Sequence, residues 1–226
     1  LSVQAPRSPM TEPVVRPYRS SDRAAVHGIG ADTAFFGEPV EALLEDRRLF
    51  CDLFFSYYTD LEPEHAWVAC SDGEVKGFLL GCVNGKRQLR GLAAVVIPRV
   101  LVRLLSGHYR LGRLTWSYAK ALSGAFFRSE IPHSFRRWYP AHLHLNVAAP
   151  WRGLGLGSRL LEAYLNQLQA EGIPGVHLHT TSRNEAACRL YARLRFRLLD
   201  ARRARLRVQR FTAMVENRCY GLSLGG

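Results

Sequence analysis

A run of strand, glycine-rich turn, helix, strand and helix between residues 141 and 194 constrains the fold more than any other feature. "AHLHLNV" (141–147) alternates apolar and polar side chains, as a strand does, and apolar residues then recur at helical intervals over 156–168. "GVHLHTT" (175–181) alternates again, and a second helical pattern follows over 187–194. Because such crossovers are right-handed, the sequence predicts two parallel strands in an α/β sheet.

The segments before residue 141 predict the remainder of one domain, over 14–216. A short strand is expected near residues 14–17, and Asp72-Gly73 between two apolar runs is a strong hairpin signal. Residues 86–140 are expected to form a helical insertion between the third and fourth strands, and residues 1–13 a flexible tail. Within the insertion, Pro98, Arg99 and Arg103 interrupt the apolar runs, which stay shorter than the ~20 residues of a membrane span. Core-covering helices are the favoured interpretation, with a membrane-surface element as the alternative.

Charge is distributed unevenly along the chain, whose net charge is +12. Residues 86–137 hold eleven Lys or Arg against one acid, and residues 183–226 hold eleven against three. This segregation favours an anionic ligand or surface near the second half of the chain, although solvated arginine-rich faces give the same count.

Cysteine usage points to a reducing compartment. The five cysteines are scattered through apolar segments without metal-ligand spacing, and the first residues lack the pattern of a secretory signal. The sequence therefore predicts a cytoplasmic protein without a metal cofactor.

The glycines of "WRGLGLGSRLL" predict an anion site at a helix N-terminus. Free backbone N–H groups and the helix dipole attract an anion there, and glycine leaves the backbone accessible. The P-loop pattern requires a lysine that is missing here. The dinucleotide pattern requires a glycine where Ser158 stands and an acid after the next strand. A phosphate cradle of another kind is expected.

This loop resembles the coenzyme A signature of the GNAT N-acetyltransferases, Arg/Gln-x-x-Gly-x-Gly/Ala. "NEAACRLYARLRF" is similar to the family's next motif at Asn184, Tyr191 and Phe196, whereas Arg195 stands where the family usually has glycine. The resemblance covers most of 14–85 and 141–216, and "YPAHLHLN" with the insertion more loosely resembles acetyltransferase-like domains related to O-GlcNAcases. It implies an α/β (α+β) fold with a mixed, centrally splayed sheet flanked by helices.

The resemblance also implies acetyl-CoA as co-substrate and a set of residues that bind it. The pantetheine arm would follow the 142–147 strand, and the loop would hold the pyrophosphate. The implied binding residues are Leu145, Val147, Arg152, Gly153, Leu154, Gly155, Leu156, Gly157, Ser158 and Asn184. Tyr191 would protonate the departing thiolate, a role that requires a hydroxyl within reach of the sulfur.

Two histidines are the candidates for the base that deprotonates the acceptor. Family members often use a glutamate on the fourth strand, and this strand offers His144 and then His142 instead. The alternation predicts that His142, His144, His177 and His179 share the sheet face opposite the 156–168 helix. Metal binding by these histidines is considered and not favoured, because neither a carboxylate nor a cysteine accompanies them.

The predicted activity is therefore direct transfer of an acetyl group to a primary amine of a small molecule, amino sugar or peptide. The alternative is a catalytically inactive acetyltransferase-like domain that binds acetyl-CoA or an acidic partner. Nucleic acid is not expected as a partner, and the sequence is compatible with a homodimer. The acceptor itself is not specified by any motif.

Overall fold

The computed structural model describes residues 12–35, 37–208 and 211–225. The residues 1–11 of the predicted tail lie outside the described residues. Seven strands form one mixed sheet in the order β1-β2-β3-β4-β5-β7-β6. Their bounds are β1 (Val14–Pro17), β2 (Ala66–Ser71), β3 (Glu74–Cys82), β4 (Ala141–Val147), β5 (Gly175–Thr181), β6 (Arg197–Val208) and β7 (Phe211–Ser223).

The β4–β5 pair is parallel, as the crossover argument predicts. The other strand pairs in the described residues are antiparallel. The hairpin at Asp72-Gly73 is also confirmed. Asp72 (φ 52°) and Gly73 (φ 77°) have the left-handed backbone of a tight turn between β2 and β3. The last strand continues to Ser223, beyond residue 216 where the sequence places the end of the domain.

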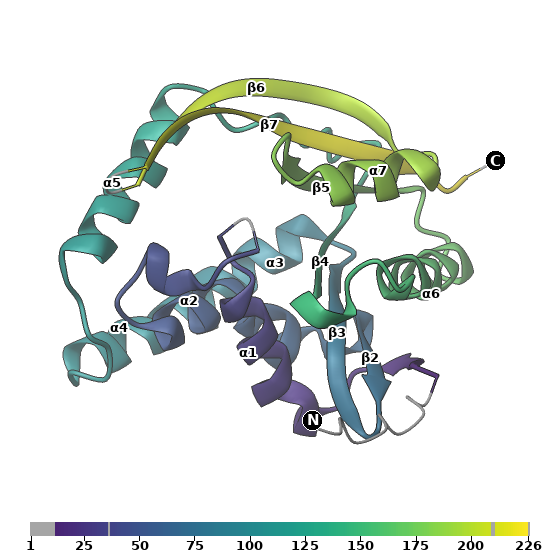
Figure 1. Ribbon diagram of the computed structural model, residues 1–226, viewed down its shortest axis with the longest axis horizontal. Coiled ribbons are helices and arrows are strands. Elements are labelled where there is room, and N and C mark those ends of the chain that lie inside the picture. The colour runs from purple at the N-terminus through teal and green to yellow at the C-terminus, as the bar shows by residue number, and fades with distance from the viewer. Residues whose placement is uncertain (1–11, 36, 209–210, 226) are drawn as a thin grey trace, which may run out of the picture.

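Helices cover the two faces of the sheet (Figure 1). The first face carries α1 (Arg23–Asp32) and α2 (Arg47–Phe54), and the second carries α6 (Leu156–Ala170). Between β3 and β4 lie α3 (Gly85–Gly91), α4 (Ile97–Leu105) and α5 (Arg113–Phe127), with a π-helical turn at Leu92–Val96. The predicted helical insertion is confirmed. The helix α7 (Glu185–Arg193) follows β5.

Strand alternation divides the core into two clusters. Leu79 of β3 and Leu143 of β4 pack with Leu160 and Tyr164 of α6, while Phe78 of β3 packs with the α1–α2 layer. Leu143, Leu160 and Tyr164 are each at most 4% exposed. The side-chain pattern of β4 thereby fixes which face receives α6 and leaves the histidines on the other.

Candidate active site

The glycine loop forms the N-terminal end of α6. Gly153 and Gly155 have φ values of 79° and 80°, and Gly155 is the residue immediately before the helix. A Cβ would meet nothing within 4 Å at either position, so the backbone conformation explains these glycines better than the space around them does. At Gly157 the reason is packing, because a Cβ would lie 3.2 Å from Leu190 Cδ2 on α7.

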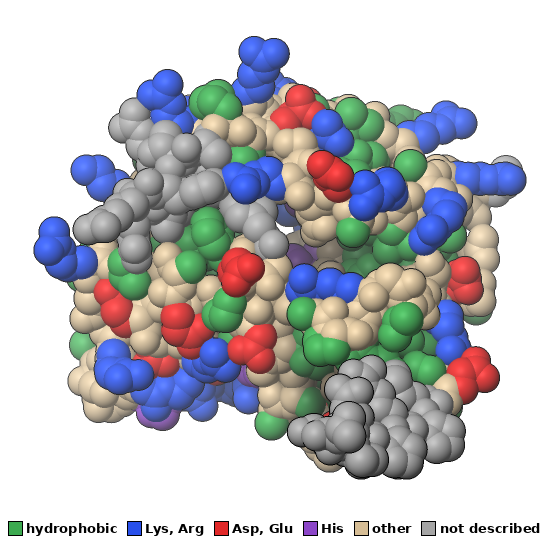
Figure 2. All heavy atoms as spheres, viewed as in Figure 1, with side chains coloured by type: hydrophobic (Ala, Val, Ile, Leu, Met, Phe, Trp, Pro, Cys, Tyr) green, Lys and Arg blue, Asp and Glu red, His purple; other side chains and the backbone are tan. Residues whose placement is uncertain are grey.

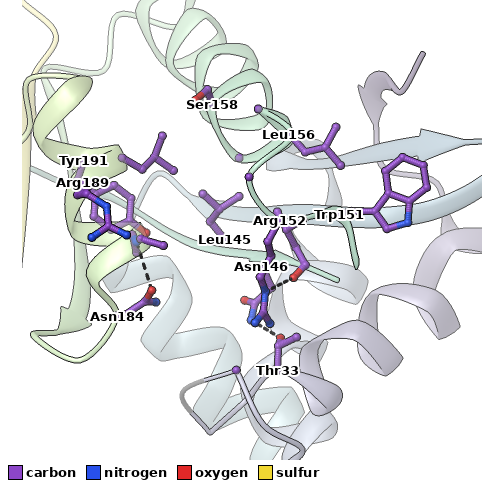
Figure 3. Close-up of a pocket in the computed structure, with 18 of the residues that line it drawn as sticks. Thr33, Leu145, Asn146, Trp151, Arg152, Leu156, Ser158, Asn184, Arg189 and Tyr191 are labelled. Atoms are coloured by element: carbon purple, nitrogen blue, oxygen red, sulfur yellow. Dashed lines mark hydrogen bonds between the residues drawn. The ribbon is translucent and has the colours of Figure 1, made fainter. Parts of the chain in front are cut away.

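The loop opens into a cavity of about 530 Å³ between the end of β4, α6 and α7 (Figure 3). The lining includes Tyr191 and nine of the ten predicted coenzyme-binding residues: Leu145, Val147, Arg152, Gly153, Gly155, Leu156, Gly157, Ser158 and Asn184. Leu154 is the exception and does not line the cavity. It is 57% exposed.

The cavity is electropositive. Arg152, Arg183, Arg189 and Arg193 are among its lining residues, and none of the lining residues in the described part of the chain is acidic. The first-turn N–H groups of α6 add to this, because the earliest helical bond runs from Arg159 N to Gly155 O (3.1 Å). Figure 2 shows Lys and Arg side chains above and below the hollow in the centre of the face drawn there. The glycine motif predicted Arg152 as a binding residue. For Arg183, Arg189 and Arg193, the only sequence signal was the excess of basic residues over 183–226.

The two central strands separate next to this cavity. Within the described residues, β4 pairs with β5 only at Ala141↔Val176 and His142↔His177, so the strands diverge from Leu143 onward. Arg152 Nε donates to the Val147 carbonyl oxygen (3.0 Å), and Asn146 Nδ2 donates to Thr33 Oγ1 (2.6 Å). The predicted splay is confirmed, and it exposes the backbone edge of β4 to the cavity.

Tyr191 lies on α7 with its side chain against the cavity. It is 5% exposed and packs against the rings of Phe196 and Tyr220, with centroid distances of 5.7 and 5.9 Å. Desolvation raises the pKa of its hydroxyl, which therefore keeps its proton at neutral pH. Asn184 lies at the start of α7, where its Oδ1 accepts from Ala187 N (3.2 Å), so a structural role for Asn184 is visible.

His142 and His144 do not line this cavity and instead share one partner, Tyr58. The Tyr58 hydroxyl lies 2.7 Å from His142 Nε2 and 3.0 Å from His144 Nε2, and it accepts from Gln88 Nε2 (2.8 Å). Sequence reasoning missed Tyr58, because it precedes the histidines by more than eighty residues and belongs to no motif.

The four histidines do share one sheet face, as predicted. Ring centroids are 6.0 Å apart for His142–His144, 5.6 Å for His142–His177 and 5.7 Å for His177–His179. His144 is exposed to solvent, and desolvation by neighbouring protein atoms lowers its pKa to about 4; desolvation lowers the pKa of the half-buried His142 as well. The two imidazoles are therefore neutral at pH 7. In the described part of the chain, no three His, Cys, Asp or Glu side chains converge as ligands of one ion.

Comparisons with known proteins agree with this fold and site. Residues 124–196 match the model of the "Acetyltransferase (GNAT) family". The crystal structure of SsHAT is similar over 95% of this chain and 99% of that chain, with 30% identity and a TM-score of 0.72. The Salmonella typhimurium protein yncA, solved with its cofactor acetyl-CoA, shares 14% identity and a TM-score of 0.54 over 94% of each chain.

A curated relative matches over a shorter segment. The mycothiol acetyltransferase of Nocardiopsis dassonvillei is 45% identical over 56 residues, which are 25% of this chain and 17% of the length of that relative. The fold, the glycine loop and these matches define a protein of the GNAT class. The chain belongs to the GNAT acetyltransferase family.

Several sequence predictions are not addressed by these matches. Cytoplasmic localisation, the homodimer and the looser resemblance to O-GlcNAcase-related domains stay predictions. No helix in the described part of the chain is long and apolar enough to cross a bilayer.

Proposed function

We propose that the protein is an acetyl-CoA-dependent N-acetyltransferase that moves the acetyl group directly to a primary amine of a small molecule, amino sugar or peptide. The observation that carries the proposal is the cavity at the start of α6, where left-handed glycines, free helix N–H groups and four arginines come together. A coenzyme with several phosphates fits that chemistry. When bound, acetyl-CoA supplies an acetyl group activated as a thioester.

The cavity residues divide the task of binding the coenzyme. Backbone N–H groups of residues 153–158 and the Arg152 side chain would hold the pyrophosphate, and the edge of β4 at Leu145 and Val147, which does not pair with β5, would hold the pantetheine arm. Arg183, Arg189 and Arg193 supply further positive charge. These assignments rest on the lining of the cavity and on family membership.

Proton transfer is assigned to two separate groups. Tyr191 retains the proton on its Oη at neutral pH and would donate it to the leaving sulfur. His144 and His142 are neutral at pH 7 and therefore able to accept the proton of the acceptor amine. A histidine whose pKa is about 4 holds a proton weakly, and the His144 side chain is exposed to solvent, so we assign His144 the role of taking the amine's proton and releasing it to water.

The test is an amine screen on the full chain with acetyl-CoA, followed by mass spectrometry of the products. Polyamines, amino sugars and peptides with a free N-terminus represent the three acceptor classes. With an accepted amine, Tyr191→Phe should lower kcat by about a hundredfold, because the proton donor is lost. Tyr118→Phe, on α5 and outside the cavity, should leave kcat unchanged. Acetyl-CoA binding without acetylation of any class would instead identify an inactive binding domain.

A further inference from the structure

The outer face of the helical segment 85–105 exposes large apolar side chains. Leu105 is 89% exposed, Val102 66% and Leu89 65%, and Ile97 and Leu101 are also exposed. Its second helix, α4, lies at the opposite end of the molecule from α6 and α7 (Figure 1). α5 has no buried residue, and it exposes Trp116, Phe126 and Phe127.

Helix geometry places the four exposed apolar residues of α4 on one face. At 100° per residue, Ile97, Leu101, Leu105 and Val102 fall within an arc of about 140° on α4. Val96 and Val100, on the opposite side, are 2% and 7% exposed and form the contact with the body. Packing within the described residues therefore accounts for the inner face, and among those residues the outer face has no apolar partner.

Ion pairs hold α4 in this orientation. Arg103 Nη1 lies 2.5 Å from Asp52 Oδ2, and Arg99 Nη1 lies 3.0 Å from Asp60 Oδ2. Asp52 is buried beneath the helix and also accepts from the Tyr109 hydroxyl (2.6 Å). These contacts fix the apolar face outward.

Unpaired cations flank the apolar face at its two ends. In the part of the chain that the structure describes, the side chains of Lys86, Arg90, Arg110 and Arg113 are exposed and make no ion pair. The one acid of residues 86–137, Glu130, is bonded to Arg128 (2.7 Å). Docking two copies through this face would bring like charges together without acids to offset them. A nucleic acid would leave the leucines exposed.

We infer that this face docks on an anionic lipid bilayer. The α4 surface, as we name it, comprises Lys86, Leu89, Arg90, Ile97, Leu101, Val102, Leu105, Arg110 and Arg113. Its apolar side chains enter the boundary between headgroups and acyl chains, and the cations contact lipid phosphates. The interaction is peripheral, and it is independent of the proposed catalytic function.

Vesicle flotation of the full chain tests the inference. Vesicles of phosphatidylglycerol mixed with phosphatidylcholine should bind the protein, and added salt should weaken that binding. Pure phosphatidylcholine vesicles should bind it far less. The double variant Leu101→Gln/Leu105→Gln should bind at least about tenfold more weakly, because it removes inserted apolar area. Arg90→Gln/Arg113→Gln should lose about tenfold on anionic vesicles.

The variants carry their own controls. The four substituted side chains are exposed, so circular dichroism and Tm should match those of the wild type. Val14→Gln replaces an apolar side chain that is 60% exposed on β1, outside the α4 surface, and should bind vesicles like the wild type. Absence of wild-type binding to anionic vesicles would overturn the inference, as would equal binding by Leu101→Gln/Leu105→Gln. A lipid-free dimer that this double variant dissociates would assign the face to a second copy and overturn it too.

Discussion

The Tyr58 hydroxyl contacts both His142 and His144, which lie on β4 where this strand separates from β5. A change at this one hydroxyl therefore tests the role of both histidines. Tyr58→Phe keeps the ring but removes the bonds to His142 and His144. If those histidines receive the acceptor's proton, kcat/KM for the amine should fall by about tenfold or more, with acetyl-CoA affinity unchanged. Steady-state kinetics with each substrate varied separately measures this.

The neighbouring tyrosine is a matched control. Tyr57 Oη donates to the buried Glu62 (2.6 Å), and its ring packs against Tyr58. Within the described part of the chain, Tyr57 forms no hydrogen bond to His142 or His144. Tyr57→Phe should therefore cost stability while leaving kcat/KM near the wild-type value. Full activity in Tyr58→Phe would remove the histidine pair from the proposed proton route.

Arg195 is the residue where the sequence departs from the family motif, and the structure shows the consequence. Its φ of 63° lies in the left-handed region that glycine adopts freely. Arg195 N donates to Ala192 O (3.1 Å), and Phe196 N donates to Tyr191 O (2.9 Å). Arg195 therefore forms the turn that follows the end of α7, the helix that carries Tyr191.

Replacing this arginine by glycine should stabilise the protein. Arg195→Gly is expected to raise the free energy of unfolding by about 1 kcal/mol, because it relieves the left-handed backbone. Arg189→Gly, in the interior of the same helix, should lower it by about 1 kcal/mol. Urea denaturation measures both values, and a loss of stability in Arg195→Gly would show that its side chain, rather than its backbone, dominates at this position.

The sequence predicted those site residues that are close together along the chain. The glycine loop stands out by its spacing, and Tyr191 was indicated by the resemblance of its motif to that of the family. Tyr58 reaches the histidines, and Gln88 reaches Tyr58, only through the packing of the insertion and the α2–β2 connection against β4, which no local pattern encodes. The left-handed backbone at Gly153 and Gly155 was not predicted, because glycine spacing does not report φ.

At the scale of elements, the two ends of α6 offer a controlled comparison. Gly155 precedes the helix with φ 80° and Gly172 follows it with φ 69°, and a Cβ would meet open space at both positions. Gly155→Ala and Gly172→Ala should each lower the free energy of unfolding by about 1 to 2 kcal/mol, because each forces a left-handed alanine. Urea denaturation of the pair checks this. Unchanged stability in either variant would contradict the backbone explanation for that glycine.

Most elements were predictable where their periodicity was strong. β4, α6, β5 and α7 all form where alternation or helical spacing indicated them. β7 extends beyond the segment that the sequence pattern indicated. The pattern did not predict this extension, because Asn217 and Gly221 interrupt the apolar alternation there. Pairing with β5 up to Gly175↔Ser223 nevertheless keeps this segment extended. Strand pairing is a tertiary property, and local sequence does not record it.

For the whole molecule, buried neutral histidines make stability depend on pH. His27 is 8% exposed, and burial lowers its pKa from 6.5 to about 4. The unfolded chain binds this proton more readily, so the contribution of His27 is present above pH 6.5 and is lost as pH falls towards 4. His27 alone should cost about 2 kcal/mol of stability between pH 7 and pH 5.

The variant His27→Gln isolates that contribution. It removes the titrating group but keeps a polar side chain facing Thr59 Oγ1, which lies 3.3 Å from His27 Nε2. Urea unfolding at pH 7 and pH 5 should show a smaller loss of stability in His27→Gln than in the wild type. An identical loss in both proteins would place the pH sensitivity elsewhere.

The account as a whole depends on the cavity at the start of α6 binding acetyl-CoA, and calorimetric titration tests this most directly. The wild type and Gly172→Ala should bind acetyl-CoA with the same affinity, because Gly172 lies at the far end of the helix. Gly155→Ala, at a matched stability cost, should bind at least about tenfold more weakly, because the loop backbone holds the phosphates. Absence of binding by the folded wild type, or equal affinity in Gly155→Ala, would contradict the account.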